Sequence, residues 1–302
     1  MFLHNDKELF KDIITETASS LGIDPSIIEK DYYVTVFLKE IVNIQPDIVF
    51  KGGTSLSKCY KLISRFSEDI DLNIQCETRP TEGQRRRLKA DIVSTIEKFG
   101  FALVNPDDVR SRRDFNKYII SYPTIFSATY LKQQLIVETA VFLRSYPCER
   151  LTATSFVYDF LVKNNHSDII TEYELEPFEL NVQSAERTMI DKLYALGDYY
   201  LTGTINGHSR HIYDICRLLE IVEIDDELKQ LKEQVRIERK SDKQCPSAND
   251  DVNFKALLGE IIKKEAYRPD YENITFALLF EKLSYDDAVT ALEKILNSKL
   301  FD

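Results

Sequence analysis

The sequence predicts an α+β protein, with a mixed-sheet α/β domain in residues 1–182 and an all-helical bundle domain in residues 183–302. Two observations lead to this prediction. Runs with strand character occur only before about residue 183, and the later apolar residues repeat at helical spacing. The length of 302 residues suits two domains of about 150 residues each.

Two helices are expected in the first 40 residues. Leu9, Ile13 and Ile14 recur at helical spacing. Pro25 directly follows Asp24, a combination that marks the start of a second helix. The chain therefore opens with helices and reaches its first strand only afterwards.

A strand, a glycine turn and a helix are expected next. Residues 48–50 form a short β-branched and aromatic run, which Gly52 and Gly53 stop. Thr54 is then placed to cap a helix. The apolar face of that helix comprises Leu56, Tyr60 and Ile63.

The remaining elements follow from the same two periodicities. Residues 69–74 alternate polar and apolar side chains, which is typical of a half-buried strand. A charged helix is expected at about residues 82–99. Further strands are expected at residues 118–120, 124–126 and 135–138. The C-terminal helices are expected at about residues 185–201, 209–221, 226–238, 253–265 and 285–298.

The composition limits the class of protein. The five cysteines are scattered and form no CxxC pair, so we expect neither a disulfide framework nor a zinc ribbon. We expect no signal peptide and no membrane span, because the N-terminus lacks a basic start and no uncharged apolar run reaches about 18 residues. A soluble protein of the reducing cytoplasm is predicted.

Two carboxylates follow the glycine turn. Asp69 and Asp71 are two residues apart on a strand, so both side chains leave one face and repel each other unless a divalent cation lies between them. Gly52 and Gly53 would let a phosphate approach the backbone at a helix N-terminus. Separately, these features are an ordinary turn and a solvated strand face, and the spacing of a P-loop is missing. Together they favour metal-dependent nucleotidyl transfer.

The segment Lys51-Gly-Gly-Thr-Ser-Leu56, with Arg65-Phe-Ser-Glu-Asp-Ile-Asp-Leu72 behind it, resembles the signature of the AbiEii/AbiGii-type nucleotidyltransferases. These are the toxin arm of bacterial abortive-infection and toxin–antitoxin systems, within the polymerase-beta-like nucleotidyltransferase superfamily. Supporting matches lie at residues 28–32, 186–188, 191–196 and 210–215. The resemblance covers roughly residues 25 to 220 and adds nothing for the C-terminal residues beyond.

The resemblance implies a nucleotidyltransferase fold for the first domain and site residues in both domains. The family's nucleotide-phosphate motif matches at Gly52, Gly53, Thr54 and Ser55. Asp69 and Asp71 match the two metal-binding carboxylates, which implies Mg²⁺ as the cofactor. Lys192 matches the essential lysine, which would bind the triphosphate, and Asp214 matches the downstream acidic residue. All four side chains are expected to face one cleft.

A third metal ligand and the role of the lysine remain open at this stage. Glu138 is the candidate third carboxylate, since it ends an apolar run and shares a strand face with Ile136. The alternative is an ordinary charge on an edge strand. Without the resemblance, Lys192 would be a surface lysine that packs its stem on apolar neighbours and pairs with Glu186 or Asp191.

Asp214 also has a plain alternative. Arg210 and Arg217 lie four residues before it and three after it, as in an ordinary intrahelical salt-bridge face. In the catalytic interpretation, replacing Asp214 by asparagine lowers activity without loss of thermal stability. His208 and His211 are three residues apart, but no third ligand is in sight, so no zinc site is predicted.

Two basic clusters stand out from a chain whose formal net charge is −11. One lies at residues 85–89 and the other at residues 110–117. Either is suited to hold an RNA backbone locally. The alternative is a solvated helix face and a charged loop.

The resulting hypothesis is a Mg²⁺-dependent enzyme that moves a nucleoside monophosphate from an NTP to an acceptor hydroxyl. By the resemblance, the acceptor is a tRNA 3′ end, the consequence is arrested translation, and a separately encoded antitoxin counters the toxin. One rival is transfer to a small cationic acceptor such as an aminoglycoside, which a protein of charge −11 would attract. The other rival is a catalytically inactive, NTP-binding interaction module.

Overall fold

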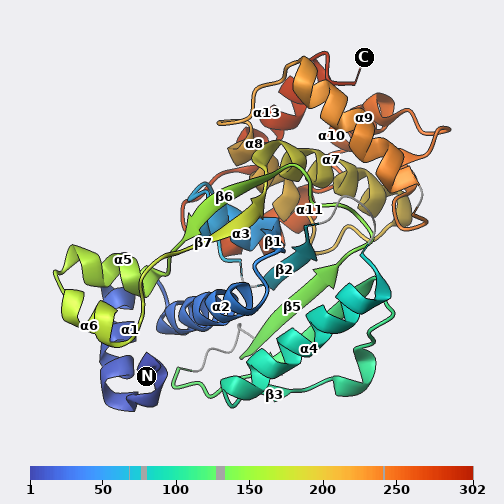
Figure 1. Cartoon of the computed structure of the whole chain (residues 1–302). Coiled ribbons are helices and arrows are strands. Elements are labelled where there is room, and N and C mark those ends of the chain that lie inside the picture. The colour runs from blue at the N-terminus through green and yellow to red at the C-terminus, as the bar shows by residue number, and fades with distance from the viewer. Residues whose placement is uncertain (68, 76–79, 127–132, 241, 302) are drawn as a thin grey trace. The chain divides into compact units, whose positions relative to one another are not determined.

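The computed structural model describes residues 1–67, 69–75, 80–126, 133–240 and 242–301 (Figure 1). The chain divides into two compact units. The first unit comprises residues 1–61 and 67–182, and the second comprises residues 62–66 and 183–302. The predicted α+β class is confirmed, with a mixed sheet in the first unit and helices in the second. Residues 62–66 lie inside the predicted first domain but pack with the helical unit.

The described residues contain one seven-stranded sheet. Its strands are β1 (Ile48–Lys51), β2 (Asp69–Ile74), β3 (Ala102–Leu103), β4 (Phe115–Ser121), β5 (Gln134–Ala140), β6 (Cys148–Ala153) and β7 (Phe178–Gln183). Their order is β3-β4-β5-β2-β1-β7-β6. β2 runs antiparallel to β1 and parallel to β5, and β4 is antiparallel to β5. The strand that carries the two aspartates is therefore central.

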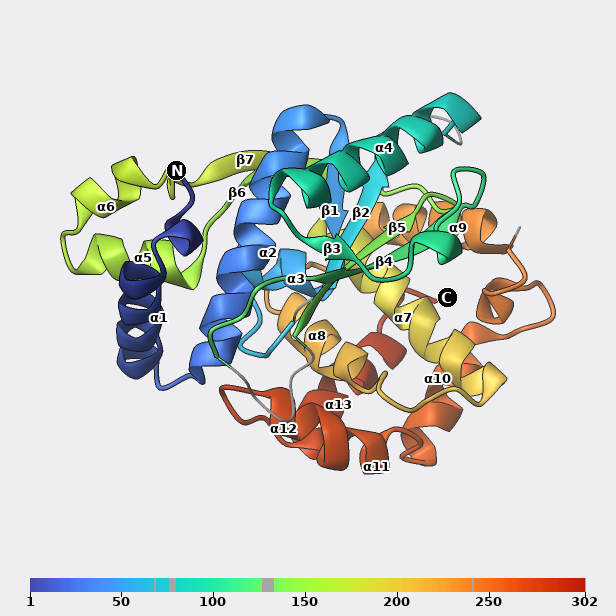
Figure 2. The same cartoon turned by 90° about the horizontal axis from the view of Figure 1, so that it is seen from below.

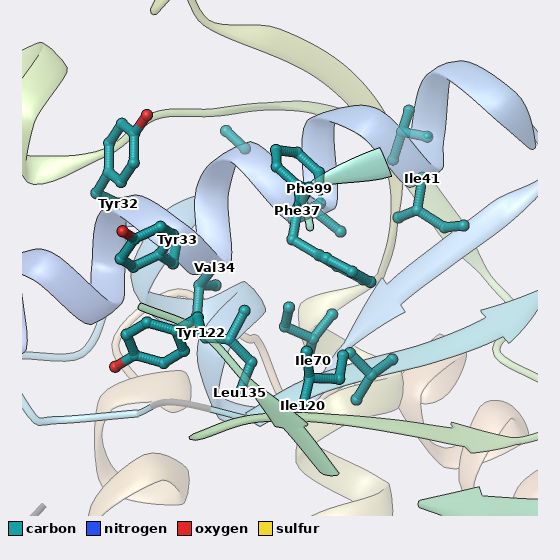
Figure 3. Close-up of a cluster of buried hydrophobic side chains, with 14 of the residues drawn as sticks. Tyr32, Tyr33, Val34, Phe37, Ile41, Ile70, Phe99, Ile120, Tyr122 and Leu135 are labelled. Atoms are coloured by element: carbon teal, nitrogen blue, oxygen red, sulfur yellow. The ribbon is translucent and has the colours of Figure 1, made fainter. Parts of the chain in front are cut away.

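Helices pack on one face of this sheet. The first unit contains α1 (Lys7–Leu21), α2 (Pro25–Ile44), α4 (Glu82–Lys98), α5 (Phe156–Lys163) and α6 (Ser167–Glu172). α2 and α4 cover the same side of the sheet (Figure 2). Phe37 and Ile41 of α2 belong to one buried cluster with Ile70 and Leu135 of the strands (Figure 3). Because side chains alternate along a strand, the residues on either side of Ile70 point to the opposite face.

The helix after the glycine turn is shorter than predicted. α3 (Gly52–Lys58) begins at the first glycine, directly after β1. Lys51 occupies the N-cap position without a side-chain hydrogen bond, so the expectation that Thr54 caps the helix is wrong. Tyr60 lies beyond the helix end. The positive φ of Gly52 (77°) lets the chain turn from strand to helix at once, before the hydroxyl residue is reached.

The strand expected at residues 124–126 does not form. A carboxylate of α2 accepts hydrogen bonds from this segment in place of a neighbouring strand. Glu29 accepts hydrogen bonds from the hydroxyl of Thr124 (2.6 Å) and from the backbone N–H groups of Ile125 (2.8 Å) and Phe126 (3.3 Å). A long-range side-chain contact therefore overrides the β propensity of this run.

The second unit is built from helices. They are α7 (Ala185–Thr202), α8 (Arg210–Leu218), α9 (Asp226–Lys240), α10 (Phe254–Lys263), α11 (Arg268–Asp270), α12 (Phe276–Leu278) and α13 (Tyr285–Leu296). α7 packs against α8, α9 and α10, and α13 packs against α8 and α10. The five predicted C-terminal helices are confirmed within a few residues at their ends, whereas the short helices between Arg268 and Leu278 were not predicted.

Two further expectations concern the cysteines and the membrane. Cys59, Cys148, Cys216 and Cys245 carry free thiols. Cys76 lies outside the described residues. None of the helices in the described ranges combines the length and the apolar character that a bilayer-crossing segment needs.

Candidate active site

The two aspartates of β2 lie on the partly exposed face of the sheet. Ile70 and Leu72 are fully buried, whereas Asp69 and Asp71 are only partly buried. The predicted alternation is confirmed over residues 69–72, whereas Asn73 is buried like its neighbours. Both carboxylates therefore leave the strand on the side opposite the helical layer.

A row of charged residues crosses the sheet at Asp71. The register pairs Asp71 with Lys51 of β1 on one side and with Glu138 of β5 on the other, and Glu138 in turn pairs with Lys117 of β4. The ammonium of Lys117 lies 2.8 Å from Glu138 Oε1. Partial burial lowers the pKa of Lys117, but the hydrogen bond and charge of Glu138 and the charges of Asp69 and Asp71 raise it overall. Lys117 is therefore held as a cation beside the carboxylates.

Gly52 makes room for the carboxylate of Asp71. A Cβ atom at this position would lie 2.0 Å from Asp71 Oδ2 and 2.9 Å from its Cγ. The close approach follows from the sheet, because Lys51, the residue before Gly52, is paired with Asp71. Gly52 also has a positive φ of 77°, which a residue with a side chain rarely adopts. The carboxylate thus packs directly against the start of α3.

Replacing Gly52 by alanine is expected to destabilise the protein and to displace the carboxylate of Asp71, with loss of transfer activity. The left-handed backbone alone costs about 1 kcal/mol, and the Asp71 side chain would have to move away from the new methyl group. Gly22→Ala is the matched control, since Gly22 has φ 67° but no atom within 4 Å of its Cβ position. Thermal unfolding and transfer rates of both variants separate the two effects. Equal losses in both would show that the contact with Asp71 has no role.

Thr54 and Ser55 are fully buried in the first turn of α3. The Thr54 hydroxyl shares a hydrogen bond of 3.0 Å with the hydroxyl of Ser67, and the Ser55 hydroxyl donates to the carbonyl oxygen of Gly52 (2.9 Å). Both hydroxyls are thus engaged inside the first unit. A phosphate at this turn would meet backbone N–H groups rather than these side chains.

Asp69 and Asp71 are the candidate ligands for a magnesium ion on this face of the sheet. In the described part of the chain, no three His, Cys, Asp or Glu side chains gather closely enough to hold a metal ion. Glu138 lies beside Asp71 in the sheet and is engaged with Lys117, and it forms no group of three metal ligands with Asp69 and Asp71. Nor is it an edge-strand charge, because β5 lies between β4 and β2. Mg²⁺ is commonly held by one or two carboxylates together with substrate phosphates, so the pair Asp69 and Asp71 suffices.

The other two predicted site residues form an ion pair inside the second unit. Lys192 Nζ donates to Asp214 Oδ2 at 2.7 Å. Asp214 has no exposed surface, and Lys192 is 6 % exposed. Neither alternative therefore applies: Lys192 is not a surface lysine paired with Glu186 or Asp191, and the partners of Asp214 are not the arginines of its own helix.

A third residue completes this buried cluster. Arg65 holds Asp214 with two donors, Nε to Oδ1 at 2.7 Å and Nη2 to Oδ2 at 2.8 Å. Burial raises the pKa of the Asp214 carboxyl, but the charges and hydrogen bonds of Arg65 and Lys192 outweigh it and hold that pKa well below its usual range. Burial lowers the pKa of Lys192, Asp214 raises it, and the charge of Arg65 lowers it further.

His208 and His211 both pack against the aromatic ring of Tyr199. His208 stacks on Tyr199 with 3.6 Å between ring centroids, and His211 lies parallel to the same tyrosine at 5.9 Å. Burial lowers the pKa of both imidazoles. Within the described residues, no third His, Cys, Asp or Glu side chain joins the two histidines in a group that could hold a metal ion.

The motif at residues 28–32 has an internal structural role. Glu29, as described above, anchors the residues that follow β4. Asp31 accepts a hydrogen bond from Lys58 at the end of α3 (2.5 Å) and from the backbone N–H of Phe156 at the start of α5 (3.0 Å). This part of α2 therefore fixes the helix that follows the glycine turn.

The two basic clusters lie side by side in the first unit. Arg85 of α4 pairs with Asp114 (2.5 Å), and Lys89 donates to the carbonyl oxygen of Val109 (2.8 Å). The exposed Arg112 pairs with Glu82 at the start of α4. These contacts join the two clusters, which lie 25 residues apart in sequence, into one basic surface. Several of its cations already have acidic partners.

Two residues that contact the predicted site residues, Lys117 and Arg65, could not be recognised as such from the sequence. Lys117 stood within a basic cluster, and only the register of β4 and β5 places it opposite Glu138. Arg65 stood within the matched segment before β2, but its partner Asp214 is 149 residues away. The only hint of a role for Arg65 in the sequence was its place at the start of the matched segment Arg65–Leu72.

Comparison with known proteins was made against families and against curated proteins. The family model described as nucleotidyl transferase AbiEii toxin, type IV TA system, matches residues 37–294. This match reaches well beyond residue 220, where the resemblance read from the sequence ended, so the C-terminal helices belong to it too. No curated protein matched the chain.

Proposed function

The chain belongs to the AbiEii family of nucleotidyltransferase toxins from type IV toxin–antitoxin systems, and from this we propose that it transfers a nucleoside monophosphate from an NTP to a hydroxyl of RNA, at a tRNA 3′ end. The observation that supports the proposal best is the carboxylate pair of β2, with Asp71 packed against Gly52 at the start of α3. The proposal takes these carboxylates as the ligands of a metal ion and the backbone N–H groups of the neighbouring turn as donors to phosphate.

In the proposed reaction, the acceptor hydroxyl oxygen attacks the α-phosphorus and its proton is released to solvent, while the bond to the bridging oxygen breaks and pyrophosphate leaves. Asp69 and Asp71 would hold Mg²⁺, which when bound promotes ionisation of the hydroxyl and offsets charge on the leaving group. Glu138 remains a third carboxylate one strand away, with Lys117 as its partner.

The chain's own donors would bind the rest of the nucleotide. The backbone N–H groups at the start of α3, from Gly52 to Ser55, are suited to donate hydrogen bonds to phosphate oxygens. We propose that the ammonium of Lys192 binds the triphosphate, with Asp214 holding that ammonium in place. A separately encoded antitoxin would counter the toxin, whose product would be a tRNA unable to support translation.

The joined basic surface is proposed to hold the RNA backbone. Replacing Arg85, Arg86 and Arg87 by alanine, or Arg112 and Arg113, is expected to weaken RNA binding and to flatten its dependence on salt, because fewer counterions are released. NTP affinity should stay within about twofold, since the lost charges neutralise RNA phosphates. Binding isotherms at several salt concentrations test this. Unchanged RNA affinity in both variants would favour the small cationic acceptor instead.

The acceptor is identified by incubating the protein with Mg²⁺ and each NTP labelled at the α-phosphate, with total RNA or with an aminoglycoside. Label in tRNA supports the proposal, and label from the γ-phosphate should not transfer. Label in the aminoglycoside alone would support the small-acceptor rival, for which the net charge of −11 is the favourable observation. NTP binding without any transfer would support an inactive binding module.

A further inference from the structure

Residues 62–66 join the helical unit through backbone and side-chain hydrogen bonds. The backbone N–H of Ser64 donates to the hydroxyl of Tyr213 on α8 (2.9 Å), and its carbonyl oxygen accepts from the N–H of Phe280 (2.9 Å). The N–H of Phe66 donates to the carbonyl oxygen of Leu278 (2.9 Å). The backbone on both sides of Arg65 is therefore fixed to α8, to the end of α12 and to the residues directly after it.

The side chain of Arg65 is immobilised as well. Arg65 is 3 % exposed, and its Nη1 donates to the carbonyl oxygen of Phe66 (2.9 Å). Its Nε and Nη2 form the two-donor fork on Asp214. A guanidinium held by three nitrogens fixes the plane of the carboxylate, because each Asp214 oxygen has its own donor.

Arg65 and Lys192 are two cations on the single carboxylate of Asp214. Among the described residues, Asp214 is the only hydrogen-bond acceptor of the Lys192 ammonium, which has three N–H donors. The Lys192 ammonium therefore has N–H donors besides the one that Asp214 accepts, and these are available to an anion.

We propose that Arg65 is a positioning residue, which orients Asp214 and through it the ammonium of Lys192 for binding a triphosphate. This rests on the proposed role of Lys192. Without the arginine fork, Asp214 would be free to turn, and Lys192 alone would neutralise it. The geometry of the fork therefore matters in addition to its charge.

The test compares Arg65→Lys with Arg239→Lys. Arg239 is also a buried arginine of the second unit with two carboxylate partners, Asp198 (2.7 Å) and Asp191 (3.2 Å), but it does not contact Asp214 or Lys192. Both variants keep the positive charge but lose the paired N–H donors of a guanidinium, so both should lose thermal stability. Only Arg65→Lys should lose NTP affinity, by about tenfold or more. Calorimetry with each of the four NTPs and Mg²⁺ measures affinity, and differential scanning measures stability.

The possible outcomes are distinct. Equal NTP affinities of Arg65→Lys and Arg239→Lys would overturn the positioning role. If Lys192→Met binds NTPs as tightly as the unmodified protein, the triphosphate role of Lys192 is wrong, and Arg65 has nothing to position. If Arg65→Lys does not fold, Asp214→Glu provides the second variant, because it keeps every charge but displaces the carboxylate. Native NTP affinity in that variant would overturn the proposal.

Discussion

Replacing Asp71 by asparagine is expected to lower the rate of nucleotidyl transfer by about 10²- to 10³-fold or more, and Asp69→Asn should do the same. The substitution keeps the shape of the side chain and removes the charge that would hold Mg²⁺ on the partly exposed face of β2. Folding stability should hold or rise slightly, because the repulsion between the two carboxylates is relieved. The initial rate of pyrophosphate release measures the loss.

Asp47→Asn is the matched control for these variants. Asp47 is an exposed aspartate directly before β1, so its replacement should leave the rate within about twofold of the unmodified protein. Transfer at the unmodified rate in Asp69→Asn or Asp71→Asn would remove that residue from the metal site. A large loss of thermal stability in either would instead indicate a structural role.

Replacing Asp214 by asparagine is expected to lower both activity and stability. Removing one partner of a buried ion pair costs about 3–5 kcal/mol, and here two buried cations, Arg65 and Lys192, would lose their carboxylate. The sequence alone treats Asp214 as a cleft residue and expects unchanged thermal stability, but its complete burial reverses that expectation. Urea unfolding together with NTP binding measures the two effects.

Glu220→Gln is the control in the same unit. Glu220 pairs with Arg217 three residues earlier, and its side chain is 51 % exposed, so the loss should stay within about 1 kcal/mol. If Asp214→Asn unfolds no more easily than Glu220→Gln, the cluster does not stabilise the second unit. If it keeps native NTP affinity, Asp214 does not hold Lys192 for nucleotide binding.

Local patterns predicted most of the secondary structure. The alternation of residues 69–74 predicted both the strand and the shared face of its aspartates, because a strand's period depends only on neighbouring residues. The failures have different causes. The strand expected at residues 124–126 is lost to a non-local contact, because Glu29 binds Thr124 from 95 residues away, whereas α3 starts early because Gly52 adopts a positive φ. The elements β6, α5, α6 and β7 were not predicted.

The candidate site likewise has one part that local spacing predicted and another part that depends on contacts between distant residues. The spacing of the glycines and aspartates indicated the site in the first unit, whereas the environment of Asp214 could not be predicted from its helix. Arg210 and Arg217 supply a plausible local partner set at helical spacing, yet the carboxylate takes Arg65, which is 149 residues away. Likewise, only the pairing of β4 with β5 reveals that Lys117 holds Glu138.

The most direct test follows label from an NTP labelled at the α-phosphate into purified tRNA. The unmodified protein, Asp69→Asn and Asp71→Asn are each assayed with Mg²⁺ and with excess chelator. A Mg²⁺-dependent transferase at the β2 carboxylates predicts labelled tRNA with the unmodified protein in Mg²⁺, and none with either variant or in chelator. Equal labelling by all three proteins, or labelling that persists in chelator, would contradict it.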